Sequence, residues 1–132
     1  MYDSRNETYP DERYYSRRKY RPRVPDLQNI IGATVCSVYQ VDPKLMQGTS
    51  RGTARVALAR QVAMYLAHVI GRLDYTEVGR LFGRDRTTVT HACATIEDRR
   101  DDADFDRTMD LLEGIVHRLC GVTRIIRAEA TH

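Results

Sequence analysis

The chain has 132 residues, of which 42% are hydrophobic, and its 21 Lys and Arg residues against 18 Asp and Glu residues give a net charge of +3 at pH 7. This length fits one domain, and no apolar run reaches the roughly 20 residues that a membrane-spanning helix needs, which excludes a membrane protein. The first 25 residues contain no hydrophobic segment of the kind that directs secretion, so we expect a cytoplasmic protein.

The positive charge is concentrated in two parts of the chain. Residues 1–25 carry +3 and residues 48–100 carry +4, whereas residues 26–47 carry −1 and residues 101–132 carry −3. The basic residues of the middle segment are all Arg, whose planar fork suits phosphates and guanine edges better than the Lys ammonium does. This distribution favours a surface that meets a polyanion.

The N-terminal residues 1–25 contain five Tyr and three Pro among many charges and have no apolar period, which predicts disorder. A basic tail rich in Tyr and Arg could stack on bases, or it could have no specific role. A folded domain is expected over residues 26–121, with Asp26 as the N-cap of its first helix. Residues 122–132 are expected to form a short C-terminal tail that frays.

Apolar spacing predicts helices throughout the folded domain and no strands. The stretch "VDPKLMQ" predicts a single turn capped by Asp42, and residues 54–71 predict the longest helix, with Arg55 and Arg60 outside its buried stripe. Asp74 begins a short helix with a capping-box pattern, and a last amphipathic helix runs from Phe105 to near Gly121. The fold class is therefore all-α, a multi-helix bundle.

Residues 86–99 predict a helix with two contrasting faces. An apolar stripe at spacings of three and four residues packs inward, and it consists of Val89, Ala92, Cys93 and Ile96. The opposite face carries Thr87, Thr88 and His91, short polar side chains that differ from the Glu, Lys and Gln of an ordinary solvated face. This pattern indicates a helix that lies close against a partner.

This helix and the one before it, residues 75–82, are separated by a short turn that contains Gly83. That arrangement predicts a helix-turn-helix, in which the N-terminal residues of the second helix face base edges in the major groove. Arg86 can donate its fork to guanine, Asp85 can accept from cytosine, and the Thr methyls can contact thymine.

The stretch "LARQVAMYLAHVIGRLDYTEVGRLFGRDRTTVTHACATIED" resembles the C-terminal DNA-binding domain, domain IV, of the bacterial replication initiator DnaA. That family carries "ARQ-AMYL", then "GGRDHTTV-HA" and a trailing "IE", and the resemblance extends more loosely from about Asp26 to Leu119. It implies a helix-turn-helix fold of the DnaA C-terminal, Trp-repressor-like type and binding to double-stranded DNA.

The resemblance also implies a set of DNA-binding residues. The positions that read the major groove correspond to Asp85, Arg86, Thr87, Thr88 and His91, preceded by Arg84. The pair that supports backbone contact corresponds to Arg60 and Gln61. A loop Arg enters the minor groove in the family, and here Arg51 is the first candidate and Arg55 the second.

Three departures from the family pattern bear on function. The family's "GGRDH" is shortened to "GRDR", so Arg86 replaces a His and shifts the expected base preference toward guanine. The loop before the long helix differs in length by about two residues. The chain has no GxxxxGK[ST] phosphate-binding loop, so we do not expect a complete ATP-switched initiator.

Other chemistry is disfavoured. The three cysteines cannot all pair with one another, and Cys36, Cys93 and Cys120 are expected to be buried free thiols. His91 and Cys93 lie on opposite sides of a helix, so we expect no metal site and no cofactor. No nucleophile–base or paired-carboxylate pattern is present, and we expect no enzymatic activity.

The sequence therefore predicts a cytoplasmic, nucleoid-associated protein that binds duplex DNA at sites like the DnaA box. It would act as a transcriptional regulator or as a replication regulator that competes with the full-length initiator, and the residues do not separate these roles. An alternative is an interaction module that keeps the fold but binds RNA or a protein through its N-terminal tail. Monomer and dimer both remain open.

Overall fold

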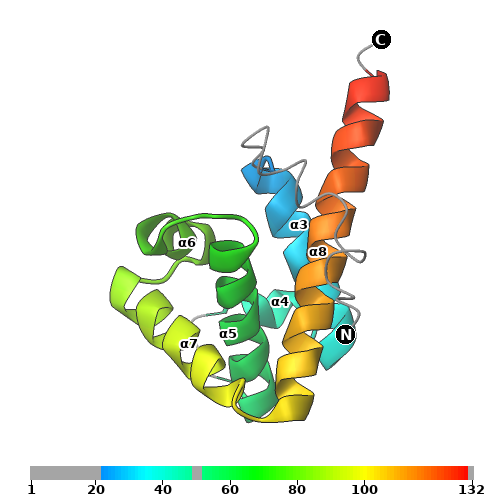
Figure 1. Ribbon diagram of the computed structural model, residues 1–132. Helices are drawn as coiled ribbons and strands as arrows, with labels where there is room; N and C mark the ends of the chain where they lie inside the picture. Colours follow the sequence, from blue (N-terminus) through cyan, green and yellow to red (C-terminus); the bar gives the residue numbers. More distant parts are fainter. Residues whose placement is uncertain (1–21, 49–51, 131–132) are drawn as a thin grey trace.

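The structure is a computed structural model that describes residues 22–48 and 52–130. These residues form six helices and no strand, which confirms the all-α prediction (Figure 1). In chain order the helices are α3 (Val24–Tyr39), α4 (Pro43–Met46), α5 (Ala54–Val69), α6 (Tyr75–Phe82), α7 (Arg86–Arg99) and α8 (Ala103–Ala130).

Helix α5 is the centre of the bundle, because α3, α4, α6 and α7 all pack against it. Its residues Ala59, Ala63 and Ala67 are fully buried and lie four residues apart, so they share one face. Side chains this small let neighbouring helices approach closely. Helix α8 lies along α3, on the other side of the bundle from the α6–α7 pair (Figure 1).

Three of the helices begin with the Asp caps that the sequence predicts. Asp42 accepts a hydrogen bond of 2.9 Å from the Lys44 N–H at the start of α4. At the start of α6, Asp74 accepts from the Glu77 N–H at 2.8 Å and Glu77 accepts from the Asp74 N–H at 3.0 Å, which completes a capping box. The third cap, Asp85, begins α7.

The predicted cap at Asp26 is wrong, because α3 begins at Val24 and its N-cap is Arg23. Asp26 instead lies in the first turn of α3 and accepts hydrogen bonds from Arg127, at 2.9 Å from Nε and 2.5 Å from Nη2. The hydrogen bond from Arg127 is the main reason that the pKa of Asp26 is lowered. This ion pair ties the end of α8 to the start of α3.

Helix α8 is longer than the sequence predicts. It does not end near Gly121 but continues to Ala130, so its 28 residues exceed the 16 of α5, which was expected to be the longest helix. Leu119 is 42% exposed and lies outside the buried stripe of α8, which consists of Met109, Leu112, Val116 and Cys120. In the described part of the chain no helix is apolar and long enough to cross a membrane.

The three cysteines are buried and free, as predicted. Burial raises the pKa of the Cys93 and Cys120 thiols to about 11 and also raises the pKa of Cys36. At neutral pH these thiols are therefore protonated and poor nucleophiles.

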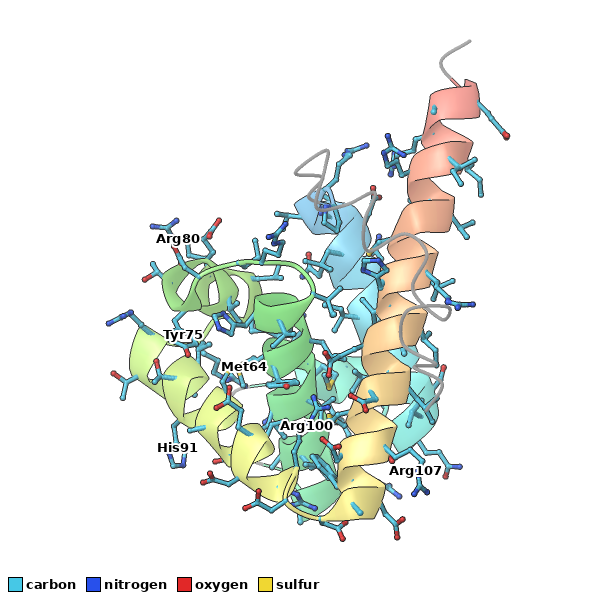
Figure 2. All side chains as sticks on the ribbon, in the orientation of Figure 1. Met64, Tyr75, Arg80, His91, Arg100 and Arg107 are labelled. Atoms are coloured by element: carbon cyan, nitrogen blue, oxygen red, sulfur yellow. The ribbon has the colours of Figure 1, made fainter. Side chains whose placement is uncertain are left out.

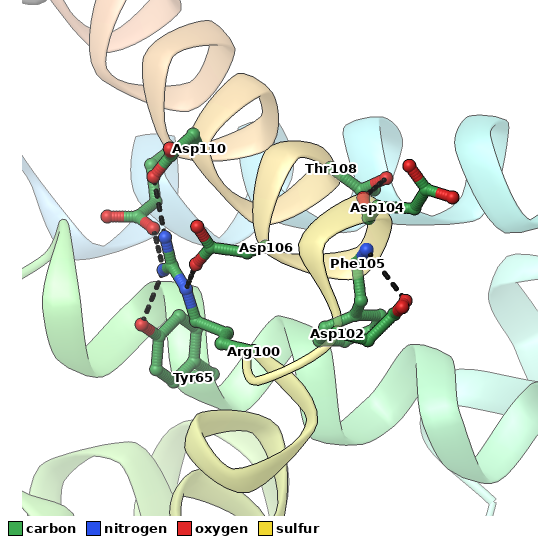
Figure 3. Close-up of polar contacts among 9 residues, drawn as sticks. Tyr65, Arg100, Asp102, Asp104, Phe105, Asp106, Thr108 and Asp110 are labelled. Atoms are coloured by element: carbon green, nitrogen blue, oxygen red, sulfur yellow. Dashed lines mark hydrogen bonds and ion pairs between the residues drawn. The ribbon is translucent and has the colours of Figure 1, made fainter.

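Arg100 joins the end of α7 to α8 and α5 through four side-chain contacts (Figure 3). Its Nε lies 2.6 Å from Asp106, its Nη2 lies 2.5 Å from Asp110, and its Nη1 lies 2.5 Å from Glu113. The same Nη1 donates to the Tyr65 hydroxyl at 2.8 Å. Burial lowers the pKa of Arg100, but the hydrogen bonds that it donates to Asp106, Glu113 and Tyr65 outweigh burial and raise the pKa above its usual value.

We expect Arg100→Ala to lower the free energy of unfolding by about 2–4 kcal/mol, because it leaves three carboxylates clustered without their cation. Arg107→Ala is the matched control, since Arg107 is 71% exposed and lies 3.6 Å from the exposed Asp104. An exposed pair of this kind contributes less than about 1 kcal/mol. Urea denaturation measures both changes, and similar losses in the two variants would contradict the role of Arg100.

Candidate nucleic-acid interface

The turn between α6 and α7 depends on two glycines. Gly83 adopts φ +65°, a left-handed conformation that glycine accepts without strain, and it ends α6. Gly79 accepts the Arg84 N–H at 2.9 Å, and a Cβ added at Gly79 would meet the Arg84 carbonyl oxygen at 2.5 Å. The chain therefore folds back closely over α6, and this contact sets where α7 begins.

We expect Gly79→Ala to destabilise the fold by about 1–3 kcal/mol, because the added methyl group forces the turn away from α6. Gly32→Ala is the matched control: Gly32 lies inside α3 and an added Cβ meets nothing within 4 Å. Replacing a helical glycine with alanine in open space stabilises by about 0.5–1 kcal/mol. The midpoint of thermal or urea unfolding should thus shift in opposite directions for the two variants, and equal shifts would contradict the close contact at Gly79.

The first helix of this pair is also held firmly. The rings of His68 at the end of α5 and Tyr75 at the start of α6 stack with centroids 4.5 Å apart. His68 Nδ1 also lies 2.8 Å from the Leu73 carbonyl oxygen. These contacts, together with the capping box, fix α6 against α5 and so provide a rigid support for α7.

Asp85 caps α7 through its Oδ1, which accepts the Thr88 N–H at 2.7 Å. The pKa of Asp85 is lowered, chiefly because the Thr88 N–H and then the Thr88 hydroxyl stabilise its carboxylate. Asp85 therefore holds the first turn of α7 in shape and also places a negative charge beside the free N–H groups of the helix start.

The two faces of α7 are as the sequence predicts. Thr87, Thr88 and His91 are exposed, and Figure 2 shows His91 pointing away from the body of the protein. The opposite face is buried, with exposures of 2% or less at Val89, Ala92, Cys93 and Ile96. Thr90 is exposed too, but its hydroxyl donates to the Arg86 carbonyl at 2.9 Å. The exposed face thus offers Thr87, Thr88 and His91 to a partner.

The charge along the exposed part of α7 changes from one end to the other. Arg86 is exposed at the first position of the helix, and Arg84 precedes it in the turn. Glu97, Asp98 and Arg99 are exposed near the other end and together leave one net negative charge there. A polyanion is therefore attracted to the first turns of α7 and repelled from the last ones.

Arg60 does not lie where the sequence predicts. It is only 8% exposed, and its guanidinium donates to the Leu45 carbonyl, with Nε at 3.0 Å and a further bond from Nη2. Burial is the main reason that its pKa is lowered, and the nearby Arg84 lowers it further. The expectation that Arg60 leaves the buried stripe of α5 is therefore wrong.

Arg84 makes a similar contact from the other side. It is half-buried, and its Nη2 donates to the Gly48 carbonyl at 2.6 Å. Two arginines from different elements thus hold two carbonyls, those of Leu45 and Gly48, at the end of α4. The connection from α4 to α5 is thereby fastened to the turn of the helix-turn-helix.

The remaining predicted residues are less closely grouped. Arg55 is exposed in the first turn of α5, Gln61 is half-buried further along the same helix, and Arg51 lies outside the described residues. Sequence reasoning did not single out Lys44 on α4 or Arg80 on α6, which are both exposed. Figure 2 shows Arg80 projecting outward from α6. Their only signal in the sequence was the excess of basic residues.

Metal-ligating side chains do not cluster in the part of the chain that the structure covers. Over residues 22–48 and 52–130, no three His, Cys, Asp or Glu side chains are grouped so that they could hold a metal ion. The three carboxylates around Arg100 are occupied by its guanidinium.

Two short helices joined by a tight turn, with the second presenting a polar face behind two arginines, define a DNA-binding helix-turn-helix domain. A family model described as the bacterial dnaA protein helix-turn-helix matches residues 28–96, which is more than half of the chain. The chain belongs to this family, and its domain is like domain IV of DnaA.

Individual relatives agree with this assignment. The chain is 44% identical over 81 residues to the chromosomal replication initiator protein DnaA of Sphingopyxis alaskensis, a match covering 61% of this chain and 17% of the relative. It is 42% identical over 85 residues to DnaA of Bordetella pertussis, covering 63% and 18%. With DnaA 2 of Chlamydia muridarum it shares 41% over 81 residues, covering 58% and 18%. The chain spans less than a fifth of these relatives.

Proposed function

We propose that the chain binds double-stranded DNA sequence-specifically at sites like the DnaA box, with the first two turns of α7 in the major groove. The observation that carries this proposal is the exposure of Thr87, Thr88 and His91 directly opposite a fully buried face. Side chains of this kind on a rigidly supported helix can contact base edges without paying for a rearrangement of the fold.

Base readout is assigned to the first turns of α7. Arg86, exposed at the first helical position, suits the O6 and N7 acceptors of guanine, and the methyl groups of Thr87 and Thr88 suit the methyl of thymine. His91 lies one turn further along the same face. The second carboxylate oxygen of Asp85 can accept from a cytosine amino group while Oδ1 remains the helix cap.

Affinity comes from the phosphates. The N-terminus of α7 offers backbone N–H groups and the positive end of the helix dipole. Arg55 and Gln61 on α5 are assigned to the DNA backbone, and Arg51, with Arg55 as the second candidate, remains assigned to the minor groove. The acidic end of α7 favours a docking in which only its first turns approach the duplex.

The main test measures how Arg86→Ala changes the affinity for a DNA site that has been obtained by selecting bound duplexes from a random pool. We expect the affinity for the selected site to fall about 5-fold to 150-fold, while affinity for a scrambled duplex changes little, since the loss falls on a base contact. Arg23→Ala, which removes an exposed arginine at the start of α3, is the matched control and should leave the preference intact.

Two results would count against this function. One is a selection without any consensus. The other is equal affinity for all nucleic acids that disappears when residues 1–21 are removed, which would support the alternative of an interaction module acting through its tail. A salt titration tests the phosphate contacts as well, because such contacts make the affinity for DNA fall with rising salt.

We assign Arg60 and Arg84 to positioning rather than to direct readout. Both guanidiniums bind protein carbonyls, so their action on DNA is to hold the α4–α5 connection beside the start of α7. Arg60 is almost fully buried. Arg84, being half-buried, can also lend its charge to a phosphate.

Arg84→Lys separates these two contributions, because it keeps the charge but not the planar fork that reaches the Gly48 carbonyl. We expect it to weaken binding to the selected site about fivefold to tenfold without altering the slope of affinity against salt. Arg84→Ala should in addition reduce that slope by about one. Fluorescence anisotropy with both variants provides the test, and wild-type affinity in Arg84→Lys would assign Arg84 to the phosphates alone.

The biological role that we propose is regulation at sites that the full-length initiator also recognises. The protein would then act in the cytoplasm on the nucleoid, either on transcription or on replication through competition for the same sites. Occupancy of the selected site with the initiator added in increasing amounts measures the competition directly.

A further inference from the structure

Helix α8 carries a second apolar stripe beside the one that packs on α3. Leu111, Ile115, Leu119, Val122 and Ile126 are between 42% and 62% exposed, and their spacings of four, four, three and four residues put them on one face. We call these five residues the outer stripe. Exposed apolar residues scattered singly need no explanation, but a continuous row of five over four turns indicates an interaction site.

The last turns of α8 make this point more strongly. Among the described residues after Cys120 none is buried, and Ile125 and Ile126 are 56% and 58% exposed. Figure 1 shows this end of α8 extending past the other helices, while the pair of Arg127 with Asp26 ties it to α3. Short helical segments with little packing are marginal in water, so this apolar end requires a partner to be stable.

The spacing of the outer stripe is self-complementary. Leu111 and Ile126 lie equally far from a midpoint between residues 118 and 119, and so do Ile115 and Val122. An antiparallel copy of α8, related by a two-fold axis through that midpoint, would therefore place Leu111 opposite the partner's Ile126 and Ile115 opposite the partner's Val122. Leu119 lies next to the axis. An interface that pairs the same patch on both copies has this property.

The charges at the two ends of the stripe agree with the same arrangement. Arg107 and Glu129 lie on the same edge of the stripe, close to its two ends, and both are exposed. In the antiparallel pairing each Arg107 approaches the partner's Glu129, so opposite charges meet at both ends.

We propose that the outer stripe is a dimer interface, through which α8 pairs with α8 of a second copy of this chain in antiparallel orientation. The proposal does not depend on DNA binding, because it uses no residue assigned to the DNA interface. The C-terminal end of α8 is covered in the dimer, which accounts for its apolar residues.

The first experiment measures the mass of the full chain by sedimentation equilibrium over a range of concentrations. We expect a reversible dimer, and Ile115→Glu combined with Val122→Glu should weaken it more than about 100-fold, because four carboxylates would be buried at the interface. Val69→Glu is the matched control, since Val69 is 37% exposed at the end of α5 and should leave the dimer unchanged. Circular dichroism establishes that each variant is folded.

The second experiment tests the orientation. A mixture of the Leu111→Cys and Ile126→Cys variants should form a disulfide-linked dimer on mild oxidation, whereas each variant alone should not. In the antiparallel pair, two copies of position 111 lie about 22 Å apart, well beyond the reach of a disulfide. The native cysteines are buried, with the pKa of Cys93 and Cys120 raised to about 11, so they do not compete.

A chain that remains monomeric at all concentrations overturns the proposal and assigns the stripe to another occupant, either residues 1–21 or a different protein. A dimer that persists in the double glutamate variant places the interface elsewhere. Cross-linking of the Leu111→Cys variant with itself, rather than with the Ile126→Cys variant, would show a parallel pairing and overturn the orientation.

Discussion

The close packing of other helices around α5 is the constraint on which this structure depends. Ala59, Ala63 and Ala67 leave room for neighbouring backbones, and four helices use α5 as a common support. Because α6 and α7 are both packed against it, α7 is supported by the most buried element of the fold. Larger side chains on this face would push α7 outward and change the surface that it presents.

Local signals in the sequence were sufficient for much of this architecture. A cap involves residues two or three positions apart, so Asp42, Asp74 and Asp85 could be assigned without knowing the fold. The period of α7 likewise separated its buried face from Thr87 and His91, since a helix of fixed pitch determines which residues lie together. The helix-turn-helix itself therefore followed from spacing.

Contacts between segments that are distant in the sequence could not be predicted from these local signals. Arg60 was placed on the surface because an arginine is usually exposed, yet a carbonyl fifteen residues away binds it inside the bundle. Nothing in the local pattern singled out Arg100, although it binds side chains from both α5 and α8. The end of α8 was misjudged for a related reason: periodicity shows which residues of a helix are apolar, not whether a neighbouring element covers them.

The contacts of Arg100 have a consequence for how this protein could engage its target. They fasten the residue that follows α7 to the first turns of α8, so the angle between the two helices is fixed. Any orientation imposed on α8 is then passed to α7. If two molecules pair along α8 with two-fold symmetry, their two copies of α7 must point in opposite directions. The natural target would then be an inverted repeat, or two separate boxes bridged by a loop of DNA.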